Sequence, residues 1–163
     1  MLLDLGPPHP TLTRALKGNA DAIRFVQALV RVCDVWDDLI DGDVEAAPER
    51  IHQAFVLALL ELPASPFFRQ NHDALYPVLL SGVLSWWSAN QLEQRPSVRA
   101  RSIAYVARSQ IAEVITVSAA LIGGLDWARE IGPEVKLFIH SDDPRAYADE
   151  MEKKHGMAVD PEA

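Results

Sequence analysis

The sequence predicts an all-α protein, folded as a compact antiparallel helical bundle. Apolar residues recur with helical period over several long stretches, and clear period-2 alternation is missing. Proline and glycine fall between these stretches, where they punctuate helices. The chain of 163 residues is 49% hydrophobic and 23% charged, which suits one ordinary core. We therefore predict a single helical domain over residues 1–163, with residues 1–18 and 156–163 as peripheral arms.

The first two helices have recognisable ends. A helix is predicted over residues 20–41, because Asn19 is a good N-cap and Gly42 follows the last apolar turn. A second helix is predicted over residues 48–62, because Pro48 suits an early helical position and the segment "LPASP" follows.

Two further long helices are predicted from their stop signals. The third is expected over residues 77–93, before Pro96, which disfavours a helical conformation in the preceding residue. The fourth is expected over residues 97–122, where the glycine pair 123–124 should end it. Shorter helical segments are expected at residues 125–130, 133–139 and 144–155.

Composition and charge exclude several classes of function. The formal charge is −8, and the 15 Lys and Arg residues form no basic stripe, so we expect no nucleic-acid partner. The single Cys33 excludes an intramolecular disulfide and a multi-cysteine zinc site. The start "MLLDLGPPHP" does not resemble a secretory signal. The longest apolar run, 111–125, contains Glu113 and is short for a bilayer span, so we expect a cytoplasmic protein without a membrane span.

The stretch "RVCDVWDDLIDGDVE", residues 31–45, concentrates aspartates near the end of the first predicted helix. Four residues from Ile23 onward lie on one side of that helix: Ile23, Val26, Val30 and Cys33. Four acids centre on the same side one or more turns later: Asp34, Asp37, Asp38 and Asp41. Carboxylates thus continue the apolar stripe and are expected to face inward or across a cleft.

This acidic cluster has two interpretations. Asp is a poor helix former, and negative charges near a helix C-terminus oppose each other and the helix dipole, at a total cost on the order of a few kcal/mol without a cation. A divalent cation such as Mg²⁺ would relieve that repulsion, because it prefers carboxylate oxygens. The alternative is a solvated acidic helix end without a ligand. The residues alone leave both interpretations open.

The segment "VCDVWDDLIDGD" resembles the first aspartate-rich helix of squalene and phytoene synthases, in the class I isoprenoid synthase superfamily. Its "DDLID" matches the DDxxD pattern of that superfamily. The resemblance implies an isoprenoid-synthase-like core that binds Mg²⁺ and a prenyl diphosphate, with Asp37, Asp38 and Asp41 as metal ligands and Asp34 as an additional one. The match covers about twelve residues, and no second aspartate-rich motif follows, which leaves open a shortened or non-catalytic relative.

Polar and aromatic residues on other helices are candidates for the rest of the site. Glu113, with Gln110 beside it, interrupts the apolar fourth helix and is expected to be substantially buried as a second metal-side carboxylate. The alternatives are a carboxylate that pairs with an arginine such as Arg24, or one that is exposed at a helix edge. Three tryptophans are candidates for lining a pocket for a prenyl chain, with ordinary core packing as the alternative: Trp36, Trp86 and Trp87.

Two functions therefore follow from the sequence. One is Mg²⁺-dependent binding of a prenyl diphosphate, with ionisation or transfer as in a prenyl transferase or terpene synthase. The other is a non-enzymatic interaction or assembly protein that uses the acidic cluster and the surface around Trp86 and Trp87. A homo-oligomer or a protein partner is left open by both, and no catalytic base is assigned.

Overall fold

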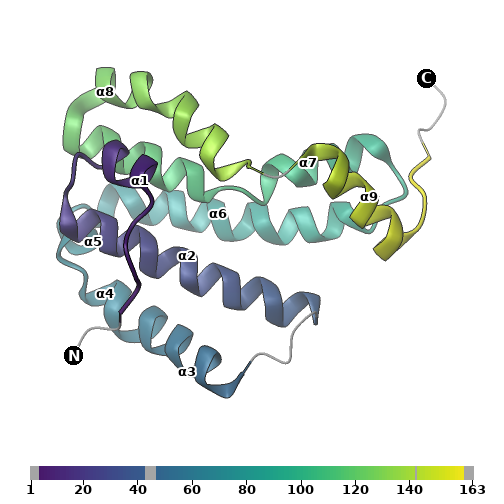
Figure 1. Ribbon diagram of the computed structural model, residues 1–163, viewed down its shortest axis with the longest axis horizontal. Helices are drawn as coiled ribbons and strands as arrows, with labels where there is room; N and C mark the ends of the chain where they lie inside the picture. The colour runs from purple at the N-terminus through teal and green to yellow at the C-terminus, as the bar shows by residue number, and fades with distance from the viewer. Residues whose placement is uncertain (1–3, 43–46, 142, 160–163) are drawn as a thin grey trace.

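The computed structural model describes residues 4–42, 47–141 and 143–159, apart from the side chain of Asp41 (Figure 1). In these residues all regular secondary structure is helical, which confirms the all-α class. Three long helices form the body of the molecule: α2 (Ala20–Asp41), α6 (His72–Glu93) and α8 (Ile111–Ile139). The shorter helices pack around them or connect them.

Helix α2 has the predicted bounds, and its ends explain why. The Asn19 side chain accepts a hydrogen bond from the Ala22 backbone N–H at 3.0 Å, which satisfies one free donor of the first turn. Gly42 has φ 69°, a left-handed conformation that glycine adopts without steric cost. Both caps are local, and the prediction of this helix is confirmed.

The second predicted helix is longer than expected. It begins at Pro48 as α3 (Pro48–Val56), continues as a π-helical segment η1 (Leu57–Glu61) and ends in α4 (Leu62–Ala64). Pro63 does not stop it, because it lies in the final helical turn. The short helix α5 (Pro66–Gln70) follows at once, capped by the Ser65 hydroxyl.

Helix α6 starts five residues before the predicted position, and Pro77 lies inside it. Proline lacks the N–H that would bond to the Asp73 carbonyl, but Asp73 lies in the exposed first turn, so solvent can reach that carbonyl. A proline near a helix start was therefore misread as the start itself. The predicted end at Glu93 is confirmed.

The fourth predicted helix is broken, which corrects the sequence-based boundaries. It consists of α7 (Val98–Ala107), a turn over residues 108–110, and α8. Helix α8 then passes the predicted stop and reaches Ile139, with only a kink at Gly124, where φ is 83° and ψ 173°. The turn is important for the site described below, because it presents Arg108 at the end of a helix instead of along one side.

A short helix lies near each end of the described part of the chain. Helix α1 (Pro10–Ala15) lies in the segment expected to be a peripheral arm, yet Leu12 and Leu16 are buried in the main core beside α8. At the other end α9 (Pro144–His155) has the predicted bounds, and Asp143 accepts a hydrogen bond from the Arg145 N–H at 2.9 Å.

The core lies at the end of the molecule where α1, the first half of α2, α5 and α8 meet. Its largest buried side chains include Phe25, Leu75, Ile115 and Ile131. Phe25 stacks on Phe68 with ring centroids 5.5 Å apart. This apolar packing places α2 firmly against α8, and the second half of α2 extends beyond it.

One helical stretch of the described chain, Val98–Ile139, is long and apolar enough by length and composition to cross a membrane. One third of its most apolar window (33%) is buried within the fold. The kink at Gly124 divides α8 into two pieces, each shorter than the about 20 residues that a span needs. The expectation of no membrane span stays a prediction.

Candidate functional site

A cavity of about 480 Å³ opens between the second half of α2, the middle of α6, the turn at 108–110 and α9. Its volume lies within the range of about 300–1,000 Å³ typical of small-ligand pockets. Apolar side chains from three helices form most of its wall: Leu29, Val30, Leu79, Trp86, Ile111 and Val114. Polar side chains also line it, among them Asp34, Asp37, Asp38, Arg108, His140 and Tyr147.

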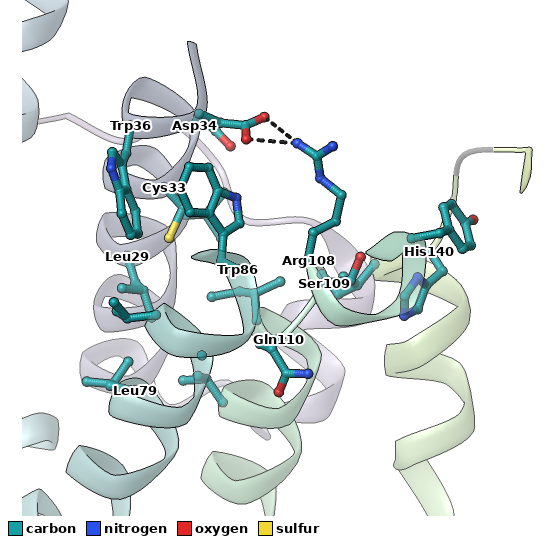
Figure 2. Close-up of a pocket in the computed structure, with 18 of the residues that line it drawn as sticks. Leu29, Cys33, Asp34, Trp36, Leu79, Trp86, Arg108, Ser109, Gln110 and His140 are labelled. Atoms are coloured by element: carbon teal, nitrogen blue, oxygen red, sulfur yellow. Dashed lines mark hydrogen bonds and ion pairs between the residues drawn. The ribbon is translucent and has the colours of Figure 1, made fainter. Parts of the chain in front are cut away.

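The cavity is polar at one end and apolar at the other (Figure 2). Leu29 and Leu79 lie together at the end nearer the core, and Asp34 and Arg108 lie at the opposite end. Trp86 stands between the two ends and lies against Trp36, with ring centroids 4.2 Å apart and the ring planes tilted by 33°. A ligand that fits this cavity would therefore have an apolar body and a polar or charged head.

A network of charged side chains holds the polar end. Arg108 donates from Nη2 to both carboxylate oxygens of Asp37, at 2.8 and 3.1 Å (dashed lines in Figure 2), and from Nη1 to Glu93 at 2.7 Å. The Tyr147 hydroxyl donates to the same Glu93 oxygen at 2.7 Å. Burial, together with the hydrogen bond to Glu93, raises the pKa of Tyr147, so this phenol stays protonated. The network ties α2, α6, α7 and α9 together.

The remaining aspartates differ in their partners. Asp38 accepts a hydrogen bond from Arg50 of α3 at 2.7 Å. Asp34 forms no ion pair within the described part of the chain. Partial burial raises the pKa of Asp34; Arg31 opposes this, whereas the nearby Asp38 and Asp37 charges add to it. The side chain of Asp41, a predicted metal ligand, lies outside the described residues.

These contacts confirm one expectation and correct another. Asp34, Asp37 and Asp38 line a cavity on the side of α2 predicted from helical period, opposite residues of the expected fourth helix. The predicted repulsion, however, is partly balanced by Arg50 and Arg108. These arginines lie 12 and 71 residues from their partners, so the argument from the helix alone could not include them.

A metal centre is not apparent from these side chains by themselves. Within residues 4–42, 47–141 and 143–159, no group of three or more His, Cys, Asp or Glu side chains is arranged to hold a metal ion. Mg²⁺ needs fewer protein ligands than that, because it typically takes one or two carboxylates, with waters and substrate phosphates completing its shell. Asp34 is the carboxylate best placed for such a role, since it lines the cavity and has no ion-pair partner among the described residues.

Of the other predicted site residues, some line the cavity and others lie outside it. Trp36, Trp86 and Gln110 line the cavity as expected. Trp87 lies outside it, on the outer side of α6, and is 55% exposed. Glu113 also lies outside it; its side chain is 43% exposed and pairs with Lys136, so the expectation that it is buried was wrong. The break before α8 changed the direction of Glu113 relative to the acids of α2.

Several residues of the polar end were not predicted from sequence. Glu93 and Tyr147 are parts of the ionic network, although nothing in their local sequence distinguishes them from surface residues. His140 also lines the cavity, and its Nδ1 is buried without a hydrogen-bond partner among the described residues. The sequence leaves open whether Arg108 meets a phosphate or a surface acid, and in the structure it contacts Asp37 and Glu93. Its neighbours are set by the turn at 108–110.

Comparison with known proteins does not assign this chain. No family model, no curated protein and no solved structure matches it. The functional conclusion therefore depends on the cavity and on the aspartate-rich segment alone.

Proposed function

We propose that the cavity binds a prenyl diphosphate together with Mg²⁺, in an antiparallel bundle with an isoprenoid-synthase-like core. The observation that carries this proposal is the polarity of the cavity, with Leu29 and Leu79 at one end, Asp34 and Arg108 at the other, and Trp86 between them. Prenyl diphosphates have the same division, with an apolar chain and a highly charged head. Asp37 and Asp38 of the "DDLID" segment line the cavity, which supports this proposal.

The apolar end would hold the prenyl chain. Each buried CH₂ group contributes about 0.8 kcal/mol, so a branched chain of several isoprene units gains most of its affinity from such a wall. Leu29, Leu79 and Val114 present aliphatic surface there, and Trp86 adds the face or edge of an indole. These side chains would also exclude water from the reacting carbon of the chain.

The polar end would hold the head group. Asp34 and Asp37, with Asp38 beside them, are the residues that would bind Mg²⁺, and the metal would neutralise charge on the diphosphate when bound. In the free protein Arg108 balances Asp37. A diphosphate would give the Arg108 guanidinium another anionic partner and release Asp37 for the cation. Ionisation or transfer of the prenyl group is the chemistry that such an arrangement would support.

Thermal unfolding with defined ligands tests this proposal. We expect Mg²⁺ with pyrophosphate to raise the Tm more than the sum of the two alone, and Mg²⁺ with farnesyl diphosphate to raise it further. A ligand at a hundredfold excess over Kd stabilises the native state by about 2.7 kcal/mol. The proposal fails if neither diphosphate shifts the Tm of the wild-type protein in the presence of Mg²⁺.

Two substitutions separate the head from the chain. Asp34→Asn should abolish the shift with both diphosphates, whereas Asp126→Asn, at a fully exposed position of α8, should leave it intact. Gly82→Leu should fill the apolar end and abolish only the additional shift from the farnesyl chain. Gly82→Ala is its matched control, because a Cβ at Gly82 would meet Gln110 at an ordinary 3.5 Å. Equal loss in Gly82→Ala and Gly82→Leu would contradict a chain-binding cavity.

A further inference from the structure

The outer face of α6 is apolar and exposed along most of its length. Five of its residues are between 49% and 59% exposed: Tyr76, Leu80, Val83, Leu84 and Trp87. Four of them follow the helical period at i, i+4, i+8 and i+11, so they form one continuous stripe, and Val83 flanks it. We call these five residues the α6 stripe. Because the opposite side of α6 packs into the fold, this helix is apolar on all sides, which is typical of a buried helix.

The charge distribution favours one kind of partner for this surface. Between Asp73 and Glu93, α6 contains no charged residue, although the chain as a whole carries a formal charge of −8. A second copy of this acidic protein would be repelled at most other surfaces, but two α6 stripes can meet without bringing charges together. A second exposed apolar patch, at Phe55, Leu59 and Leu60, is shorter than that of α6.

The order of residues in the α6 stripe also allows the stripe of one copy to pack against the stripe of a second copy. Large aromatic side chains, Tyr76 and Trp87, lie at its two ends, and Leu80 and Leu84 lie in the middle. When two such helices meet in opposite directions about a two-fold axis, Tyr76 of one copy lies beside Trp87 of the other. Leu80 then meets Leu84. Each copy presents the same surface, as an isologous contact requires.

The exposed area is sufficient for a weak to moderate dimer. Half of the surface of five large side chains is on the order of 450 Å² per copy, compared with about 800 Å² per partner in a standard interface. Exposed neighbours on the same face, among them Pro77, Ser88 and Gln91, would add to it. We propose that the protein forms a two-fold symmetric homodimer through the α6 stripe, with the two α6 helices antiparallel.

This dimer would be next to the cavity but does not depend on the proposed ligand. Val83 belongs to the stripe and also lines the cavity, so the second copy would lie near the cavity opening. Ligand binding is measured by thermal unfolding and dimerisation by sedimentation, so the two proposals can be tested separately. Failure of the diphosphate experiment leaves the dimer untouched, and a monomeric protein leaves the cavity untouched.

Sedimentation velocity of the full chain, without ligand, tests the proposal. We expect the wild-type protein to dimerise at concentrations up to about 100 μM. Leu80→Glu should weaken the dimer at least about a hundredfold, because it places an unpaired charge in an apolar contact. Leu59→Glu, at the other exposed patch, is the matched control and should dimerise as wild type does. Circular dichroism should show unchanged helix content in both variants, since both positions are exposed.

A charge pair tests the direction of the helices. Leu80→Glu and Leu84→Lys should each be monomeric alone, and an equimolar mixture should form a heterodimer, because residues 80 and 84 of different copies meet only in the antiparallel arrangement. A monomeric wild-type protein would overturn the proposal. So would equal dissociation of the Leu59→Glu variant, which would place the contact elsewhere. Binding of a monomer to phosphatidylcholine vesicles, lost in Leu80→Glu, would likewise reject it and identify a lipid surface as the partner of the stripe.

Discussion

The two halves of α2 are one continuous helix, yet they are held in different ways. In the first half Ile23 and Val26, on the side of α2 that the acids share, are at most 8% exposed and belong to the apolar core. In the second half the inward side carries Asp34 and Asp37 and faces the cavity. The same face of the same helix is therefore apolar and buried at one end, and charged and accessible at the other.

The difference shows how a helix can support both a core and a site. Apolar burial in the first half is non-directional and depends on area, so it orients the whole helix without requiring particular partners. The second half depends on discrete contacts, such as Arg108 with Asp37 and Arg50 with Asp38. Contacts of this kind can be exchanged for a ligand, whereas a packed core cannot rearrange at low cost.

The largest expected effect is in the apolar half. Phe25→Ala should lower the free energy of unfolding by about 3–5 kcal/mol, because it removes a buried ring that stacks on Phe68 and leaves a cavity. Urea denaturation measures the change. Leu39→Ala, in the second half and 47% exposed, is the control and should change stability by less than about 1 kcal/mol. Similar values for both variants would show that the two halves are not distinct.

An intermediate effect is expected in the ionic network. Glu93→Gln should cost about 2–3 kcal/mol, because it removes the charge that balances Arg108 in a site where the Glu93 side chain is only 7% exposed. Arg108 keeps its contact with Asp37, which limits the loss. The matched substitution Glu134→Gln breaks an exposed ion pair with Arg14 and should cost less than about 0.5 kcal/mol. If the two costs were equal, the network would not position the polar end.

A smaller effect of opposite sign is expected at Asp34. Its pKa is raised in the folded state from the ordinary 3.8, so folding favours the protonated form. The protonated Asp34 carboxyl contributes fully to the stability of the folded state below pH 3.8. This contribution is lost as the pH rises through the folded pKa and the carboxyl ionises. At pH 7 Asp34→Asn should therefore stabilise the metal-free protein by a few tenths of a kcal/mol, because solvent screens this exposed group. Melting curves from pH 7 down to pH 4 should show the advantage disappearing, and a destabilised variant at pH 7 would contradict the account.

The smallest change concerns the reactivity of Cys33 rather than stability. Cys33 lies on the cavity wall, and partial burial, with the charges of Asp34 and Asp37, raises the pKa of its thiol from 9.0 to about 11. Because the thiolate is the reactive form, alkylation by iodoacetamide at pH 8 should be about a hundredfold slower than for an ordinary thiol. The rate should rise roughly tenfold per pH unit up to about pH 10. A rate at pH 8 equal to that of a model peptide thiol would contradict this.

The sequence alone determined the features that depend on neighbouring residues. The bounds of α2 and α9 followed from Asn19, Gly42 and Asp143, because caps satisfy backbone groups within one turn. The inward side of α2, with its acids after Val30, followed from helical period. The all-α class followed from the same period and from the missing alternation.

Only the tertiary structure decided which residues meet. Pro77 does not start α6, and the turn at 108–110 breaks a stretch of helical period, because packing against other helices outweighs local preference. That turn brings Arg108 to Asp37 and leaves Glu113 outside the cavity. One helical step of 100° decides that Trp86 faces the cavity and Trp87 the outer stripe. Contacts between distant segments depend on how whole helices pack, and no local pattern in the chain specifies that.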